Sequence, residues 1–306
     1  MSDTILINQL PTRTWNFLGV NETALPWEEA ETCTLEETCF RAEGQEQSPR
    51  FVSVDGCGEY SRKTIRVEAP EGSSVTVIET LRTAAHLAVC TQLQAGKNAR
   101  IRLVQVQDTA EGSSLYTQVS GSCADGGQIE LVQIFLGRGD LYSDSRIELP
   151  GQGAGFQADI GYLGRGKQTI DLNLVVNHYG KKTESAIRAA GALKDAAQKI
   201  FRGTIDFKKG SSDSVGNEQE TVLMLGENVR NKTVPLILCA EENVVGNHGA
   251  TIGELDDETL FYLESRGIGR EAAENLMARA AIERVTRTVG DPETEENIMN
   301  RLNEEL

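Results

Sequence analysis

Positive charge is scarce in this chain of 306 residues. Lys and Arg number 30 against 46 Asp and Glu, which gives a net charge of −16. This balance argues against a nucleic-acid-binding protein, because such proteins neutralise phosphates with basic side chains. No run approaches about 18 consecutive apolar residues, so we expect no membrane span. The N-terminus lacks a basic stretch followed by an apolar run, so we expect no signal peptide and a cytoplasmic location.

Cysteine pairs of the C-x-x-C type are also missing. The six cysteines are scattered singly along the chain, at positions 33, 39, 57, 90, 123 and 239. In a reducing compartment a disulfide framework is not expected. We therefore expect these cysteines to be small buried hydrophobic residues.

Acidic charge is concentrated at the two ends of the chain. Residues 1–50 carry 3 basic and 9 acidic side chains (−6), and residues 254–306 carry 6 and 14 (−8), which leaves −2 for the middle. We therefore predict an irregular head over 1–58, a long body over 59–253 and a tail over 254–306.

The body shows the alternation of apolar and polar residues that is typical of strands. Expected strands start near 101, 115, 129, 141, 156, 170, 187 and 201. Turn-forming segments such as CADGG and PGQGAG separate them. An antiparallel meander and a β-solenoid both fit this spacing. The lack of two-residue hairpin turns favours the solenoid, whose end coils would expose free strand edges to a partner.

The tail changes to helical periodicity. A first helix is expected around Leu260, with Asp256 as its N-cap and Gly267 at its end. A second helix is expected from about Arg270 to Thr288, followed by a short acidic helix after Pro292. The tail is therefore predicted to be a small helical domain, of which one simple function is to cover the end of the solenoid.

Several motifs occur in order over the last hundred residues. They are Phe201-Arg202-Gly203, His248-Gly249-Ala250-Thr251, Leu260-Phe261-Tyr262-Leu263 and Ser265-Arg266-Gly267-Ile268. This set closely resembles the C-terminal half of the SufB/SufD family, the core subunits of the SUF machine for iron–sulfur cluster assembly. The resemblance implies a mainly β fold, a right-handed parallel β-helix with a small C-terminal helical domain.

The resemblance also implies partners and a role. Family members pair with a paralogue through their terminal strands and bind SufC, an ABC-type ATPase, through the helical tail. A transient iron–sulfur cluster is built at the pair's interface from sulfur that a cysteine desulfurase supplies. On this basis, the residues expected to dock the ATPase are Leu260, Phe261, Leu263, Arg266 and Gly267.

The details of the resemblance favour a SufD-like member. SufB chains carry a Glu-His-Glu-like triplet and an upstream cysteine, whereas this chain has Asn247-His248-Gly249 and no cysteine in the run NEQETVLML. Many SufD-like chains have cysteine where this chain has Gly246. The partner is then a SufB-type subunit, with a homodimer left open.

His248 is the best candidate for contact with a cluster, because neutral imidazole can ligate iron when a partner supplies thiolates. The alternative is a histidine whose hydrogen bonds are all made locally, in a turn before the helical domain. Cys239, nine residues earlier, is a weaker second ligand, and core packing is its alternative. Glu241 and Glu242 are expected in a solvated turn, and His178 in core or turn packing.

Catalysis by the chain itself is not expected. The sequence has no G-x-x-x-x-G-K-[ST] motif, so ATP hydrolysis belongs to the partner and we expect no ATP site and no enzyme activity. Two alternatives are a purely structural partner subunit and a carbohydrate-active β-helix enzyme. Aromatic residues for sugar stacking amount to only 5%, which argues against the second.

Overall fold

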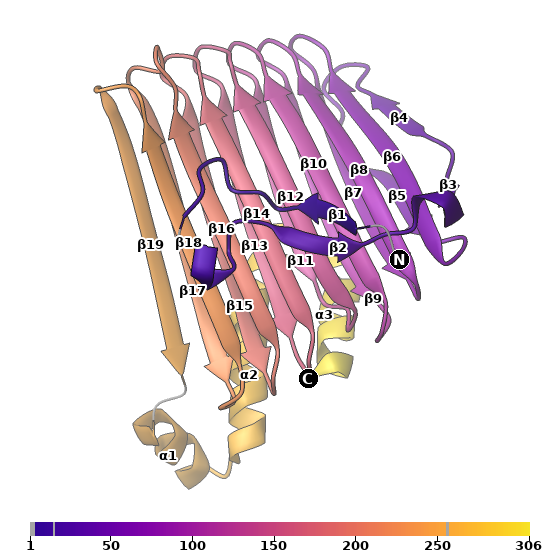
Figure 1. The fold of residues 1–306 in the computed structure, drawn as a ribbon, viewed down its shortest axis with the longest axis vertical. Coiled ribbons are helices and arrows are strands. Elements are labelled where there is room, and N and C mark those ends of the chain that lie inside the picture. Colours follow the sequence, from indigo (N-terminus) through magenta and orange to yellow (C-terminus); the bar gives the residue numbers. More distant parts are fainter. Residues whose placement is uncertain (1–3, 15, 255–256) are drawn as a thin grey trace.

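The computed structural model describes residues 4–14, 16–254 and 257–306. Its body is a parallel β-solenoid in which each coil contributes one strand to each of two sheets (Figure 1). Sheet I contains β3 (Thr32–Thr34), β4 (Thr38–Arg41), β6 (Tyr60–Ala69), β8 (His86–Ala95), β10 (Ser114–Cys123), β12 (Asp140–Leu149), β14 (Thr169–His178), β16 (Gln198–Phe207) and β18 (Arg230–Cys239). Sheet II contains β5 (Arg50–Asp55), β7 (Ser74–Thr83), β9 (Arg100–Thr109), β11 (Gln128–Phe135), β13 (Gly155–Gly164), β15 (Glu184–Lys194), β17 (Ser214–Leu225) and β19 (Val244–Glu254). The solenoid prediction is confirmed.

Apolar side chains from equivalent positions of successive coils stack in ladders between the two sheets. One ladder in sheet II joins Val75, Ile101, Ile129 and Phe156 through direct register pairs, and all four are buried. Parallel strands keep register partners on the same face, so a period-2 sequence places one whole set of residues inside. This set forms the main hydrophobic core.

The turns at one corner of the solenoid repeat the same backbone geometry. Gly72, Asn98, Gly126 and Gly153 all have φ between 53° and 69°, the left-handed region that glycine and asparagine tolerate best. The backbone N–H of each of the first three donates to a carbonyl of the next coil's turn at 2.8–2.9 Å. Repeated turns of this kind explain the near-constant strand spacing.

The tail covers the outer face of sheet II. It comprises α1 (Asp257–Ser265), α2 (Arg270–Thr286) and α3 (Pro292–Glu305). Ile282 and Val285 of α2 and Ile298 of α3 join a second apolar cluster with outward residues of sheet II such as Val104 and Val132. α2 makes the main contact with the solenoid, through β13 and β15, and carries the buried apolar stripe.

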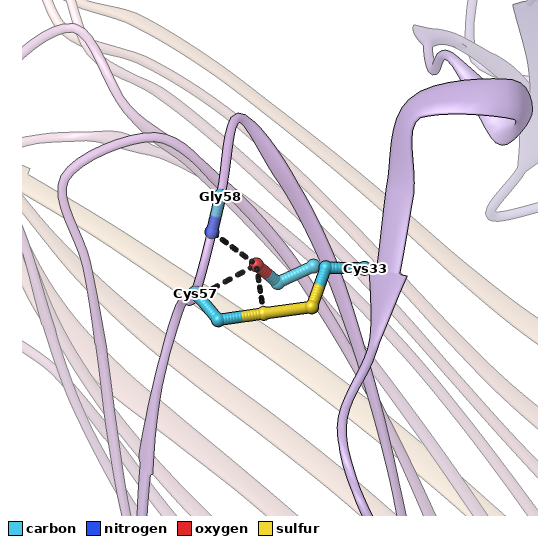
Figure 2. The surroundings of a disulfide bond; sticks show 4 residues. Cys33, Cys57 and Gly58 are labelled. Carbon is cyan, nitrogen blue, oxygen red and sulfur yellow. Dashed lines mark hydrogen bonds between the residues drawn. A yellow bond between two sulfur atoms is a disulfide. The ribbon is translucent and has the colours of Figure 1, made fainter.

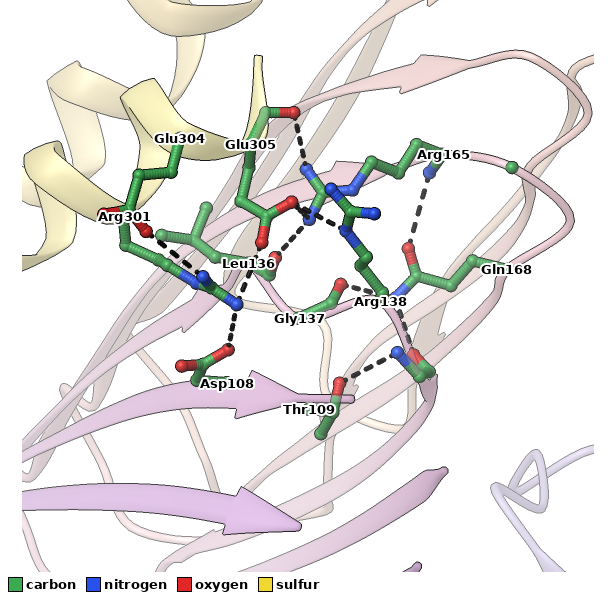
Figure 3. Close-up of polar contacts among 12 residues, drawn as sticks. Asp108, Thr109, Leu136, Gly137, Arg138, Arg165, Gln168, Arg301, Glu304 and Glu305 are labelled. Atoms are coloured by element: carbon green, nitrogen blue, oxygen red, sulfur yellow. Dashed lines mark hydrogen bonds and ion pairs between the residues drawn. The ribbon is translucent and has the colours of Figure 1, made fainter. Parts of the chain in front are cut away.

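The end of the tail is fixed to the solenoid turns by one buried carboxylate. The side chain of Glu305 is only 3% exposed and pairs with Arg138 (2.9 Å), Arg165 (2.7 Å) and Arg301 (2.9 Å) (Figure 3). Arg301 also bonds to Asp108 of β9 at 2.9 Å. Gly267, with φ +85°, ends α1 as predicted, whereas the predicted cap Asp256 lies outside the described residues. No helix in the described parts of the chain has both the length and the apolar character needed to cross a membrane.

The cysteines depart from the sequence expectation. Cys33 of β3 and Cys57 form a disulfide, and the hydroxyl of Ser61 accepts the backbone N–H of Cys57 at 2.9 Å (Figure 2). The parallel pairing of β3 with β6 sets Cys33 opposite Ser61, and the β5–β6 loop brings Cys57 to the same place. This tertiary proximity cannot be read from spacing alone. Cys123 is buried as expected, Cys90 is half-buried, and Cys39 and Cys239 are exposed.

Candidate functional site at the open end of the solenoid

The last coil leaves two strand edges uncovered. In the described part of the chain, β18 pairs only with β16 and β19 pairs only with β17. Most residues of β19 are exposed, although the equivalent strands of inner coils are largely buried. The inner face of this coil is therefore open, and its edge groups are available to another strand.

His248 lies on the inward face of this last coil. In β17 the residues Gly216, Glu218 and Glu220 alternate as buried positions, and Glu218 is the register partner of His248. Parallel register partners share a face, so His248 points to the inner side of β19 and is exposed only because no further coil covers it. The alternative of a histidine in a turn before the helical domain is wrong, since His248 lies in the middle of a strand.

Cys239 lies on the same inward face but at the end of β18. Its register partner is the buried Phe207, and its thiol donates to the carbonyl of Glu241 at 2.9 Å. Ile237 and Gly246 face each other between Cys239 and His248. The structure therefore places Cys239 and His248 on the same coil, but their side chains are not in contact. Among the described residues, no three His, Cys, Asp or Glu side chains are grouped so that they could hold a metal ion.

A buried charged cluster, unforeseen from the sequence, lies one coil below His248. Lys199 of β16 forms an ion pair with Glu220 of β17, and both side chains are at most 1% exposed. Tyr162 and Thr233 donate to the same carboxylate at 3.3 and 2.6 Å. In the sequence, this cluster is indicated only by charged residues at positions of the alternating strand pattern that should point inward.

Glu218 extends this cluster toward the open end. Its side chain is buried, and one carboxyl oxygen has no hydrogen-bond partner in the described structure. Burial, together with the neighbouring Glu220 charge, raises the pKa of Glu218 to about 8. A Cβ atom at Gly203 would lie within 2.4 Å of the Glu218 carboxylate, so the glycine of the Phe-Arg-Gly motif leaves space for this group.

A second surface is formed by the first two tail helices. Phe261 and Tyr262 of α1 are 73% and 56% exposed, and Leu276 of α2 is 50% exposed. The Arg266 guanidinium lies over the Tyr262 ring, 5.2 Å from its centre. Among the other residues expected to dock the ATPase, Leu260 is buried, Leu263 is half-buried and Gly267 forms the corner after α1.

Comparison with known proteins decides the family. Residues 52–281 match the family model described as "SUF system FeS cluster assembly, SufBD core domain". This chain belongs to the SufBD family. The match runs from β5 into α2, so the SufBD core includes nearly all of the solenoid and the helix that covers sheet II.

Individual relatives point to the SufD side of the SufBD family. The chain is 30% identical over 219 residues to the iron–sulfur cluster assembly protein SufD of Bacillus subtilis, covering 70% of this chain and 50% of that protein. It is 26% identical over 244 residues to SufBD family proteins of Staphylococcus saprophyticus and Staphylococcus haemolyticus, covering 77% of this chain and 51% of each. The chain is SufD-like, and it spans about half the length of the curated relatives that it matches.

Proposed function

We propose that this SufBD protein is a non-catalytic core subunit of an iron–sulfur cluster assembly complex. It pairs end-on, across β18 and β19, with a SufB-type subunit or a second copy, and its tail binds a SufC-type ATPase. The observation that carries this proposal is the open last coil, which presents two unpaired strand edges with His248 on their inner side. A partner that continues the sheets would enclose His248.

The nascent cluster is cargo in this proposal, passed on after assembly. His248 is the residue of this chain that would touch it, as one imidazole ligand beside thiolates from the partner. Cys239 is a secondary candidate, because its thiol is exposed on the same coil but lies away from His248. A purely structural subunit is the alternative, and it differs only in whether His248 touches iron. Membership of the SufBD family gives the carbohydrate-active alternative no support.

His248→Ala separates these two possibilities. We expect folding to be nearly unchanged, because the imidazole is exposed on the open coil. Cluster retained per folded complex should fall by at least about tenfold, since even outer-shell partners of metal ligands are worth 10–100-fold in affinity. Cluster absorbance and melting temperature are measured on the same anaerobic complexes, with Cys239→Ser as a variant of smaller effect. Normal cluster content in His248→Ala would show that His248 does not hold the cluster and would favour the purely structural subunit.

The ATPase contact is tested with point variants. Deleting the tail would expose the apolar outer face of sheet II. Loss of ATPase binding by a deletion variant could then result from misfolding as well as from loss of the docking surface. Changing both Phe261 and Tyr262 to Ser should weaken binding of the cognate SufC-type ATPase by about 30-fold or more, because exposed aromatic side chains are frequent interface hot spots. Phe51→Ser, which changes a 60% exposed aromatic on β5, is the matched control. Binding is measured by calorimetry. Equal affinities of the wild type and the double variant would show that Phe261 and Tyr262 of α1 are not part of the docking surface.

A further inference from the structure

The first coil of the solenoid is closed by the disulfide between Cys33 and Cys57. This coil consists of β3, β4 and β5, and the disulfide joins β3 to the turn that follows β5 (Figure 2). The two cysteines are 24 residues apart, so the disulfide makes nearly a whole coil into a covalent ring. In the described part of the chain, β3 and β4 pair only with β6 and β5 pairs only with β7. The first coil therefore has a neighbour on one side only.

Few other interactions hold this coil in place. Between Glu28 and Gly58, a stretch that the structure describes throughout, Ala42 and Val54 are the only apolar residues that are buried. β3 contains three residues and β4 four, so each forms a short ladder with β6. Ion pairs between exposed side chains contribute little to stability, and those of this coil are of that kind. A terminal coil with these properties is the part of a solenoid that opens most easily.

Both ends of the first coil are anchored independently of the disulfide. The N-terminal segment, in which β1 (Thr4–Ile7) pairs with β2 (Thr23–Pro26), crosses the outer face of sheet I (Figure 1). Trp27, which follows β2, is 1% exposed and packs against this segment and against Tyr60 at the start of β6. Opening of the coil would therefore release only residues 28–58, as a loop that is fixed at both ends and can close again.

The first coil covers an apolar surface. Ile65 and Val67 of β6 and Leu81 of β7 are fully buried, and their register partners on one side belong to β4 and β5. If the first coil opened, these side chains and the edges of both strands would become accessible. The solenoid would then be open at both of its ends.

The disulfide is placed where a reductant can reach it. Cys33 and Cys57 are both exposed residues. The hydroxyl of the buried Ser61 lies 3.7 Å from Sγ of Cys57 and can donate a hydrogen bond to it. Such a bond stabilises a thiolate, which makes Cys57 the better leaving group and Cys33 the sulfur that is attacked.

We propose that the Cys33–Cys57 disulfide is a redox-controlled clasp of the first coil, which opens when a dithiol reduces it and closes on reoxidation. A thiolate of the dithiol attacks Sγ of Cys33, the S–S bond breaks, and Cys57 leaves as a thiolate that takes up a proton. The second thiol then attacks the mixed disulfide and releases Cys33 as a thiol. The chain gains two electrons and two protons, and the dithiol leaves as a disulfide. The clasp lies at the end of the solenoid opposite His248 and does not depend on the proposed function.

Hydrogen exchange of the full chain, followed by mass spectrometry, tests the clasp. After reduction with dithiothreitol, the amides of β3, β4 and β5 should exchange about 30-fold faster or more, the factor that corresponds to the usual effect of a disulfide. The amides of β10 and β14 should keep their protection, and reoxidation should restore that of the first coil. Equal exchange in the oxidised and reduced chains overturns the proposal. An equal increase in all strands also overturns it, because the disulfide would then stabilise the whole chain.

Variants and thiol labelling complete the test. Replacing Cys33 and Cys57 together by Ser should give the fast exchange without any reductant. Cys39→Ser, at an exposed cysteine of β4, is the matched control and should respond to dithiothreitol as the wild type does. Iodoacetamide should label two more thiols after reduction of the folded chain, whereas the buried Cys123 stays unlabelled. A disulfide that dithiothreitol reduces only in urea-unfolded chains would overturn the clasp.

Discussion

Lys199→Met should destabilise the protein by about 3–5 kcal/mol at pH 8, because it leaves the buried carboxylates of Glu218 and Glu220 without a cation. Methionine keeps the length and apolar character of the lysine stem, and it removes the ammonium group that lies 5.5 and 5.6 Å from the ring centres of Tyr162 and Phe201. The loss therefore reports charge and not packing. In a chain of this size it corresponds to a fall of roughly 10 °C in melting temperature.

The loss should shrink as the pH falls. The pKa of Glu218 is already raised to about 8 by burial and by the neighbouring Glu220 charge, and loss of the Lys199 cation, which lowers it, raises this pKa further above that of the unfolded chain. Stability is then retained at low pH and lost as the pH rises through the folded pKa. Adding Glu220→Gln to Lys199→Met should restore most of the stability, since removing both partners of a buried pair is far less damaging than removing one.

The matched control is Lys208→Met. Lys208 pairs with Asp206, but its side chain is 37% exposed, so the change should cost at most about 1 kcal/mol. Urea unfolding followed by circular dichroism measures all four proteins. Equal unfolding midpoints for Lys199→Met and wild type would show that the pair contributes nothing to folding.

The strand body is the part of this fold that the sequence predicts best. Ladders such as Val75–Ile101–Ile129 need one apolar residue at every second position, and turns such as those at Gly72 and Gly126 need residues that accept positive φ. Both requirements are local, so they remain visible in a single sequence. The motifs of the last hundred residues supply the family, which the match over residues 52–281 confirms.

The parts that could not be predicted depend on contacts between distant segments. The pairing of Cys33 with Cys57 requires β3 to pair with β6, and the charged cluster of Lys199 and Glu220 requires two sheets to face each other. The crossing of the N-terminal segment depends on Asn8 meeting Asp171, 163 residues later. His248 was selected by motif, but its place on an inward row became clear only from the register with Glu218.

Another buried carboxyl, that of Glu79 on β7 near the N-terminal end of the solenoid, leads us to expect a substitution that stabilises the protein. Glu79 is fully buried, and its partners are neutral: Thr91 donates at 3.0 Å and Gln105 at 2.8 Å. Burial is the main cause that raises the pKa of Glu79 from 4.5 to about 7. Because the folded pKa lies above the unfolded one, the contribution of Glu79 to stability is fully present below about pH 4.5 and is lost as the pH rises through 7.

Glu79→Gln should therefore stabilise the protein at pH 8 by up to about 3 kcal/mol, the free energy that corresponds to pKa values of about 7 and 4.5. The glutamine carbonyl can still accept from Gln105, and its amide can donate to the hydroxyl of Thr91. Near pH 4.5 the variant and the wild type should unfold at nearly the same urea concentration, because Glu79 is then protonated in the folded state. Glu111→Gln, at an exposed turn, is the matched control and should show no such pH-dependent difference. A Glu79→Gln protein that is less stable than wild type at pH 8 would mean that the carboxylate form is the one that the solenoid interior favours.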